Sequence, residues 1–348
     1  MIKVLVVEDS AVVREFLLHI LSSDPAIEVI GTSHNGADAL DAVREKKPDV
    51  ITMDIHMPKM NGFDATRRIM ETHPTPIVVV SGSSTQEELS TTFKAMEAGA
   101  LAVVRRPVGI GHPEHESTAE QLVKTVKLMS EVKVVKRWPR PRAAPLAPST
   151  PKRGVGNTTA PVRVVAIGAS TGGPVVLQTI LAGLPKNFPV PIVIVQHMAS
   201  GFLQGFVEWL TGTSGLPVHV AANGEPLIAG NVYVAPDGFH TGVNDTGRIE
   251  LSKDAPESGL RPAVAHLFRS ITRVYGKSAL GVLLTGMGKD GAEELKMMRE
   301  TGAITIAQDK ESSVVHGMPG EAIRLDGATY VFSPDQITEL LAALALNP

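Results

Sequence analysis

The chain has 348 residues, of which 43% are hydrophobic and 20% are charged, and this length and composition exclude a single small domain, a fibrous repeat and wholesale disorder. The net charge of −3 is too small to create a whole-protein field that attracts nucleic acid or a membrane surface. The chain has no cysteine, so a disulfide scaffold, a thiol nucleophile and thiolate metal ligands are excluded.

The N-terminal residues give no sign of a targeting segment. Residues 1–9 lack the basic segment and the small-residue cleavage site of a signal peptide. The longest apolar stretches fall far short of the roughly 20 residues needed to span a bilayer. We therefore expect a cytoplasmic protein that is not inserted in a membrane.

The first third of the chain alternates short β-branched runs with amphipathic segments. Five runs have the composition of strands, at residues 2–7, 28–30, 50–53, 77–80 and 100–104. Helical patterns lie between them, and a last one covers residues 117–129. Apolar strands that alternate with helices predict a parallel sheet covered on both faces, so we expect a five-stranded doubly wound α/β domain over residues 1–131.

The next segment has a different composition. Between residues 132 and 163 the chain holds eight lysines or arginines, six prolines and no acidic residue. Repeated prolines favour extended segments that bury little surface. A nucleic-acid-binding arm is the alternative interpretation, but Trp138 is the only aromatic residue among the basic ones. We therefore predict a basic, proline-rich linker over residues 132–161 and no nucleic-acid partner.

Strands and helices alternate again after this linker. Apolar runs at residues 164–167, 192–195, 232–234, 279–284, 303–306 and 329–332 predict a second doubly wound parallel sheet over residues 162–348. Between about residues 216 and 253 short strands and Gly, Asn and Asp turns replace the helical pattern, which predicts a β-hairpin insertion.

Polar side chains end three strands of the first predicted domain. Glu8 and Asp9 follow the first strand, Asp54 follows the third, and Ser81 follows the fourth. The carboxyl ends of parallel strands share one edge of a sheet, so we expect these groups to converge there. Crowded carboxylates need a cation, and ligation by oxygen suits Mg²⁺. Each acid alone is explained equally well as a helix cap.

These residues carry a family resemblance. Val-Glu-Asp-Ser at 7–10, Met-Asp-Ile-His-Met-Pro-Lys-Met-Asn-Gly at 53–62 and Ser-Gly at 81–82 resemble a two-component receiver domain. The resemblance implies that Asp54 accepts a phosphoryl group and that Ser81 senses it. It also implies that Glu8, Asp9, Asp54 and the carbonyl of His56 bind Mg²⁺.

Two positions depart from the usual receiver pattern. Arg106 precedes Pro107 where the family usually has a lysine, and Val103 stands where many receivers carry an aromatic switch residue. Arginine keeps the positive charge but presents a planar fork in place of a point charge. We therefore expect Arg106 to sense the phosphoryl group with altered phosphorylation kinetics or signalling.

The second domain carries a serine, a histidine and an aspartate that each follow an apolar run. Ser170 lies in the Gly-rich segment 168–174 at the start of a predicted helix, His197 follows the run 192–195, and Asp290 lies in the Gly-rich segment 285–291. The three are typical of acyl transfer, as nucleophile, base and orienting carboxylate. A nucleotide-binding loop is the alternative, but the spacing is not G-x-G-x-x-G.

Segments 168–174, 196–198 and 285–291, behind a receiver-like domain and a linker, resemble the CheB family of chemotaxis protein-glutamate methylesterases. The resemblance implies hydrolysis of glutamate γ-methyl esters, and deamidation of certain glutamines, on chemoreceptor cytoplasmic helices by Ser170, His197 and Asp290. It implies a histidine kinase as phosphodonor. The amides of Thr171, Gly172 and Met287 are the candidate oxyanion donors.

The remaining predictions concern alternatives and partners. A non-enzymatic response regulator that binds receptors as a scaffold is the competing function. Nothing in the sequence demands more than a monomer. Three further histidines, His240, His266 and His316, lie far apart without the spacing of a metal site, so we expect structural roles for them and no metal in the second domain.

Overall fold

The computed structural model describes residues 1–82, 86–132, 134 and 161–345, with the side chains of 86–91 left aside. The chain forms two compact units, Met1–Asn157 and Thr158–Pro348, and each is described by itself. The predicted linker over 132–161 lies almost wholly outside the described residues. The domain boundaries at residues 131 and 162 therefore stay predictions.

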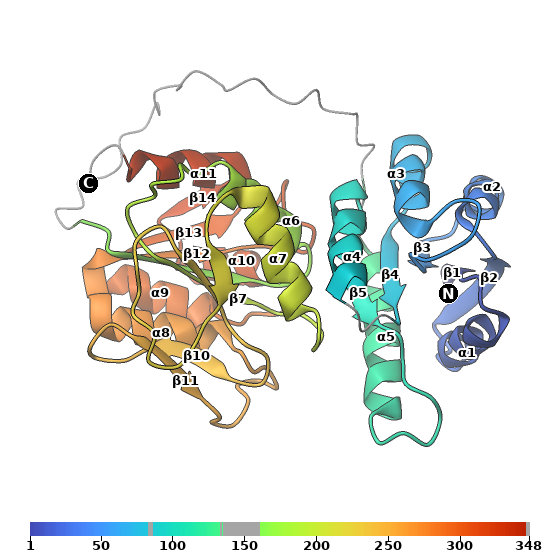
Figure 1. Ribbon diagram of the computed structural model, residues 1–348, viewed down its shortest axis with the longest axis horizontal. Helices are drawn as coiled ribbons and strands as arrows, with labels where there is room; N and C mark the ends of the chain where they lie inside the picture. The colour runs from blue at the N-terminus through green and yellow to red at the C-terminus, as the bar shows by residue number, and fades with distance from the viewer. Residues whose placement is uncertain (83–85, 133, 135–160, 346–348) are drawn as a thin grey trace. The chain divides into compact units, whose positions relative to one another are not determined.

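The first unit is built on a parallel five-stranded sheet with the strand order β2-β1-β3-β4-β5 (Figure 1). The strands are β1 (Ile2–Val7), β2 (Ile27–Ser33), β3 (Val50–Met53), β4 (Ile77–Ser81) and β5 (Ala102–Arg105). All five predicted strands are confirmed, but two differ in extent. Because β2 is an edge strand, it contains polar residues that its apolar pattern did not capture. β5 begins later because the amide of Ala100 still donates to the carbonyl of Ala95 at the end of a helix.

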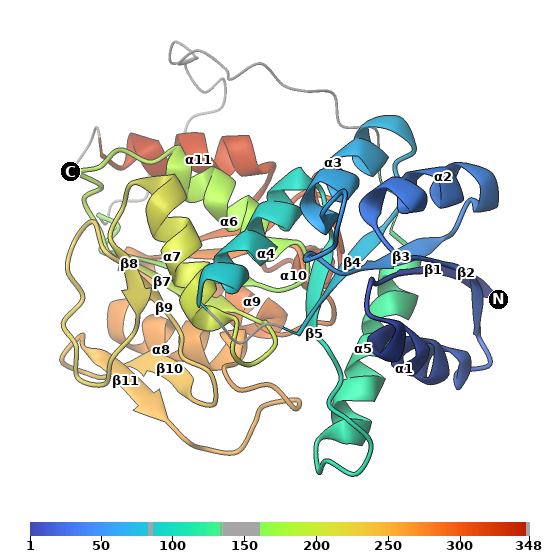
Figure 2. The same ribbon diagram turned by 45° about the vertical axis from the view of Figure 1, so that its right-hand side comes forward.

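Helices cover both faces of this sheet. Contacts between helices place α1 with α5 on one face and α2, α3 and α4 on the other (Figure 2). Side chains of Ser10, Asn35 and Asn61 accept backbone hydrogen bonds at the starts of α1, α2 and α3, which fixes where these helices begin. The helices are α1 (Ala11–Ser22), α2 (Gly36–Lys46), α3 (Gly62–Thr72), α4 (Gln86–Ala98) and α5 (His115–Ser130).

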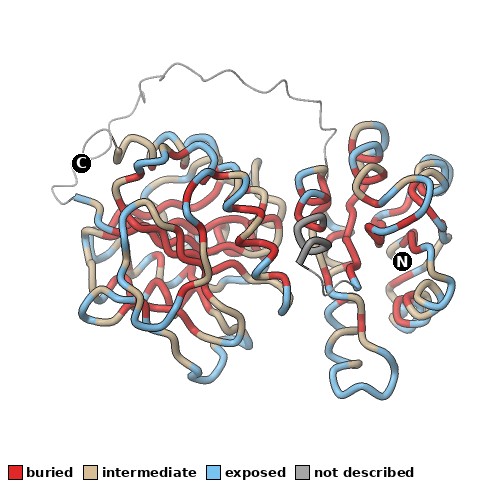
Figure 3. The backbone as a smooth tube through the Cα atoms, in the orientation of Figure 1, coloured by how far each residue is buried: buried red, intermediate tan, exposed pale blue. Residues whose placement is uncertain are grey.

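The second unit is built on a parallel seven-stranded sheet with the order β14-β13-β12-β6-β7-β9-β8. Its central strands β12, β6 and β7 are neighbours and are buried throughout, as the red core of Figure 3 shows. The strands are β6 (Val164–Ala169), β7 (Ile192–Gln196), β8 (Val218–Val220), β9 (Val232–Val234), β12 (Ala279–Leu283), β13 (Ile304–Gln308) and β14 (Tyr330–Phe332). The predicted doubly wound sheet is confirmed.

Two helical layers sandwich this second sheet. Helix α6 contacts both α7 and α11 in one layer, and α9 contacts both α8 and α10 in the other. The helices are α6 (Gly173–Ala182), α7 (Leu203–Ser214), α8 (Val264–Tyr275), α9 (Ala292–Glu300), α10 (Met318–Arg324) and α11 (Pro334–Ala343), with a short 3₁₀ turn at Gly276–Ser278. Within the described part of the chain, no helix combines the length and apolar character needed to cross a bilayer.

The predicted β-hairpin insertion is present as the antiparallel pair β10 (His240–Val243) and β11 (Ile249–Ser252). It packs against α8 on the side of the molecule that carries α9. The segment 216–253 also contains β8 and β9, which join the main sheet in parallel. The insertion is therefore smaller than the predicted segment.

Candidate active site and receiver pocket

An acidic pocket lies at the carboxyl ends of β1 and β3 in the first unit. These strands are neighbours, and the amide of Asp54 donates to the carbonyl of Val7 at 2.9 Å. One carboxylate oxygen from each of Glu8, Asp9 and Asp54 lies within 4.8 Å of the others. Glu8 and Asp54 are buried, whereas Asp9 is exposed. The structure thus brings together the three acids that the sequence places at one sheet edge.

Burial and mutual repulsion make this pocket unfavourable for negative charge. Burial, followed by the charge of Asp54, raises the pKa of Glu8 to about 7. Burial also raises the pKa of Asp54, and the guanidinium of Arg106 counters part of that rise. A divalent cation would relieve both effects, and an all-oxygen donor set suits Mg²⁺. The residues present therefore fit a magnesium site.

Arg106 reaches into the pocket from the end of β5. Its Nη2 lies 3.2 Å from Oε2 of Glu8 and 3.7 Å from Oδ1 of Asp54. The glycine at position 82 makes room for it, because a Cβ there would lie 2.8 Å from Cζ of Arg106. Ser81, which pairs with Arg105 across the sheet, is buried beside it. The pairing of this guanidinium with Glu8 was not predicted from the sequence.

The residue that follows Asp54 by two, His56, is exposed. The backbone at Gly62 packs tightly against the segment that carries His56, because a Cβ at Gly62 would lie 2.0 Å from the carbonyl oxygen of Asp54. The amide of Gly62 also donates to the carbonyl of Ile55 at 2.9 Å. The phosphoacceptor, sensing and metal-binding roles of the pocket residues stay predictions.

In the second unit, Ser170 lies on the turn between β6 and α6. Its amide donates to the carbonyl of Thr285 at 3.0 Å, and its carbonyl accepts from the amide of Gly173 at 2.8 Å. Gly172 supplies the left-handed backbone that the turn needs, with φ of 79°. The side chain of Ser170 is partly exposed at the helix N-terminus.

His197 follows β7, the strand next to β6, and Asp290 follows β12 on the other side of β6. Nε2 of His197 lies 2.9 Å from Oδ2 of Asp290, although the ring N–H is not directed at that oxygen. Hydrogen bonds of catalytic groups are often poorly aligned before substrate binds. The structure therefore brings the predicted histidine and aspartate into contact.

Asp290 is held by the start of α8. Its carboxylate accepts from the amide of Val264 at 2.7 Å and from that of Ala265 at 3.0 Å. Burial tends to raise the pKa of Asp290, but the contact with His197 and these two amides outweigh it and hold the pKa below its usual value. Asp290 is thus a carboxylate positioned against an imidazole.

Two buried polar side chains that were not predicted as site residues also support this edge. Nε2 of Gln196 donates to the carbonyls of Ser170 and His197, at 2.8 Å each. Oγ1 of Thr285 donates to the carbonyl of Thr171 at 2.9 Å and accepts from an amide near α10. A polar residue at the end of a buried strand is the signal that could have found both.

The candidate oxyanion donors occupy two loops. No backbone hydrogen bond in the described chain uses the amide of Thr171, Gly172 or Met287. The neighbouring amide of Gly173 is taken by Ser170, which removes it from consideration. Met287 lies between two glycines with a side chain that is 43% exposed. These donor assignments stay predictions.

His240, His266 and His316 were expected to lie far apart in structural roles, and two of them differ from this expectation. His316 faces Ser313, with Nδ1 3.4 Å from the hydroxyl oxygen. His240 and His266, which are 26 residues apart in sequence, stack at 4.8 Å with their rings 17° from parallel. Glu257 completes a cluster with them. Sequence spacing missed this cluster because it joins a hairpin, a loop and a helix.

Comparison with known proteins gives a consistent result for both units. The CheB methylesterase family matches residues 165–341, and the response regulator receiver domain family matches residues 4–112. A protein-glutamate methylesterase/protein-glutamine glutaminase of Nitrosospira multiformis is 59% identical over 344 residues, covering 99% of this chain and 97% of the relative. One from Geobacter metallireducens is 59% identical over 348 residues, covering 100% of both chains.

A solved structure supports the same assignment for the second unit. The crystal structure of the Thermotoga maritima CheB methylesterase catalytic domain matches with a TM-score of 0.51 and 41% identity, covering 53% of this chain and 98% of that chain. The family match spans half of the chain, and the relatives are matched along almost their whole length. The chain therefore belongs to the CheB methylesterase family, with a response regulator receiver domain in its N-terminal part.

Proposed function

We propose that the protein is a phosphorylation-regulated enzyme that hydrolyses γ-methyl esters of glutamate, and deamidates certain glutamines, on the cytoplasmic helices of chemoreceptors. The observation that carries this proposal is the contact of His197 with Asp290, which follow the two strands that flank β6, the strand that Ser170 follows. Three adjacent strands, β12, β6 and β7, supply the three groups. Full-length relatives named as methylesterases and glutaminases support the same activity.

The first half of the reaction transfers the glutamyl group to the enzyme. The hydroxyl oxygen of Ser170 attacks the ester carbonyl, and His197 takes the hydroxyl proton. Because Nε2 of His197 faces Asp290, Nδ1 is the nitrogen available for this proton in the present ring orientation. The C–O bond to methoxide then breaks, and the leaving group departs as methanol with the proton from His197.

The second half returns the enzyme to its starting state. His197 takes a proton from water, whose oxygen attacks the acyl carbonyl, and Ser170 leaves with a proton restored to its oxygen. The negative oxygen of each tetrahedral intermediate needs donors, for which the amides of Thr171, Gly172 and Met287 are free of backbone partners in the described chain. Asp290 stabilises the imidazolium in both halves.

In the receiver unit, Asp54 is proposed as the acceptor of a phosphoryl group from a histidine kinase. A carboxylate oxygen of Asp54 attacks phosphorus, and the bond from phosphorus to the kinase histidine breaks. Mg²⁺ held by Glu8, Asp9, Asp54 and the carbonyl of His56 would offset the negative charge that this transfer brings together. The close contacts of Arg106 support a role for it, beside Ser81, in sensing the added phosphate.

Regulation is proposed to act through two arrangements of the units. In the unphosphorylated protein the receiver would cover the edge of the second sheet that carries Ser170 and would block a bulky receptor helix. Phosphorylation would favour the open arrangement, which requires a difference in affinity of only a few kcal/mol. We further propose a cytoplasmic monomer with residues 132–161 as a tether.

The test is methanol release from methylated receptor cytoplasmic fragments, with and without a small-molecule phosphodonor and Mg²⁺. Wild-type protein is expected to release methanol faster with phosphodonor, and Ser170→Ala is expected to release none. The competing function, a receptor-binding scaffold without catalysis, predicts no release from either protein and equal receptor binding by both. Release that depends on Ser170 but not on phosphodonor would keep the esterase and overturn the proposed regulation.

A further inference from the structure

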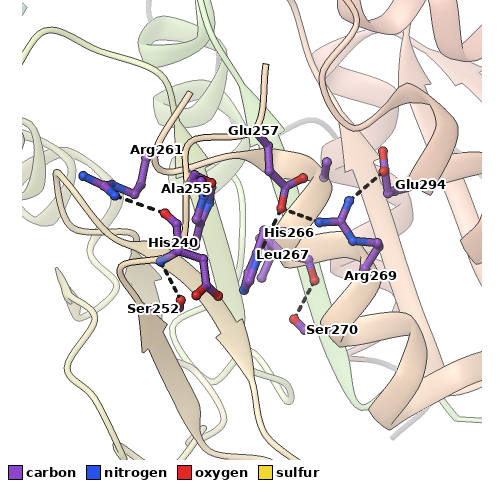
Figure 4. Close-up of polar contacts among 12 residues, drawn as sticks. His240, Ser252, Ala255, Glu257, Arg261, His266, Leu267, Arg269, Ser270 and Glu294 are labelled. Atoms are coloured by element: carbon purple, nitrogen blue, oxygen red, sulfur yellow. Dashed lines mark hydrogen bonds and ion pairs between the residues drawn. The ribbon is translucent and has the colours of Figure 1, made fainter. Parts of the chain in front are cut away.

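A second cluster of metal-binding side chains lies on the hairpin side of α8, outside the groups that the proposed hydrolysis uses. His240 comes from β10, Glu257 from the loop between β11 and α8, and His266 from the first turn of α8 (Figure 4). One ligand atom from each lies within 4.8 Å of the others. Two imidazoles and a carboxylate are the donor set of many zinc sites.

The orientation of His240 is that of a metal ligand. Its Nε2 lies 3.1 Å from the carbonyl oxygen of Ala255, which only accepts, so Nε2 carries the hydrogen. In the neutral ring, Nδ1 then presents a lone pair. The residue is 0% exposed, so water does not reach this nitrogen, and Nδ1 has no hydrogen-bond partner among the described residues. A histidine that donates one ring N–H to a carbonyl and offers the other nitrogen is typical of metal sites.

The other two ligands lie next to each other. Nδ1 of His266 is 3.4 Å from Oε1 of Glu257. This separation is close to the roughly 3.3 Å between neighbouring ligand atoms around a tetrahedral zinc ion.

Surrounding contacts hold the ligands in place. Arg269 donates to Glu257 on one side and to Glu294 of α9, at 2.9 Å, on the other. Arg261 donates to the carbonyls of Lys253 and Asp254, which fastens the loop that carries Glu257. Figure 4 shows the contacts of Arg269 with Glu257 and Glu294 beside the cluster. Carboxylates that are themselves hydrogen-bonded are common around metal ligands.

We propose that His240, Glu257 and His266 form a binding site for a divalent transition-metal ion of the zinc type, with water in the fourth position. Ligand atoms around a tetrahedral zinc ion lie about 3.3 Å apart, so the side chains need to close from their present separation by rotating. Glu257 and His266 are partly exposed and leave the ion a path from solvent. The ion would join the hairpin, the loop and α8.

The test is titration of the metal-free full-length protein with Co²⁺, whose four-coordinate complexes have strong visible absorption. Saturating Mg²⁺ is present throughout to fill the receiver pocket. Wild type is expected to gain the band with one equivalent of Co²⁺, and Zn²⁺ to abolish it. Glu257→Gln and His266→Gln are expected to weaken binding at least tenfold. The matched control is His219→Gln, which removes a histidine that pairs with Glu225 at 2.8 Å and is expected to keep the band.

A measurement on wild type alone guards against variants that fail to fold. Zn²⁺ is expected to slow amide hydrogen exchange in β10, in the loop 253–263 and in α8, and to leave the peptide that contains His197 unchanged. The proposal is overturned by a wild type without the cobalt band. It is overturned equally by a band that both ligand variants keep at wild-type affinity, or by protection confined to other segments.

Discussion

Replacing Asp290 by asparagine tests the central contact of the proposed active site. The aspartate carboxylate accepts from two α8 amides and lies 2.9 Å from Nε2 of His197. Asparagine keeps the shape but offers one oxygen in place of two and carries no charge. One of the three contacts must therefore face an amide nitrogen that cannot accept, so the substitution changes both catalysis and folding stability.

The two effects have different expected sizes. Loss of a carboxylate that orients a catalytic histidine lowers kcat by about 10⁴-fold in the serine hydrolase template, which is about 5.5 kcal/mol of transition-state stabilisation. A hydrogen bond to a charged group contributes about 1.5 to 3 kcal/mol to stability, so the second unit should lose roughly that amount. Asp290→Asn is thus expected to be folded but almost inactive.

The assay is methanol release from methylated receptor fragments at saturating phosphodonor, with thermal unfolding measured in parallel. Asp245→Asn is the matched control, because Asp245 is 89% exposed and its pair with Arg273 is on the surface. This control should match wild type in both measurements. A folded Asp290→Asn protein that keeps kcat within about tenfold of wild type would refute the role assigned to the contact.

Four further predictions concern the receiver pocket and the support of the active site. Arg106 is 28% exposed and partners a buried carboxylate. Arg106→Ala should therefore lower the unfolding free energy of the first unit by about 1 to 3 kcal/mol without Mg²⁺ and by less with Mg²⁺, as measured by urea unfolding. Since the pKa of Glu8 is raised from 4.5 to about 7, the folded Mg²⁺-free unit holds this proton at pH values where the unfolded chain has lost it. Its stability should therefore fall as pH rises from about 4.5 to about 7, by at most about 3 kcal/mol, and level off above that, and Glu8→Gln should remove this slope in unfolding curves. For the same reason Mg²⁺ affinity, measured by calorimetry, should fall about tenfold for each pH unit below 7. Gln196→Leu leaves the carbonyls of Ser170 and His197 without the donor that they share. The substitution should lower kcat about 10- to 100-fold with little change in KM. An unchanged kcat would contradict the positioning role of Gln196.

The fold followed from sequence wherever the hydrophobic pattern was regular. Buried parallel strands such as β6 and β7 are continuous apolar runs, which is why their positions were predicted within a residue or two. The edge strand β2 was predicted too short because its last three residues, Gly31, Thr32 and Ser33, are not apolar. The three-residue strand β8 lies in a segment without a helical pattern, so its parallel pairing to β9 depends on tertiary structure.

The candidate site was predicted as far as strand ends reveal it. Glu8, Asp54, His197 and Asp290 each follow a buried strand, and parallel topology brings such positions to one edge. The pairing of Arg106 with Glu8 depends on the space beside Gly82, which spacing does not encode. The cluster of His240 and His266 likewise depends on how the hairpin packs on α8.

The neighbouring positions of β12, β6 and β7 have a consequence for how this enzyme could change its substrate. Ser170 and His197 directly follow β6 and β7, so the hydrogen-bonded pairing of these two strands sets the spacing of the proposed nucleophile and base. The segment after β12 is constrained as well, because it carries Met287 and Asp290. Residues 198–202, which continue from His197 to α7, carry none of the proposed reactive groups. We therefore expect changes in substrate selectivity in residues 198–202 before the segment after β12.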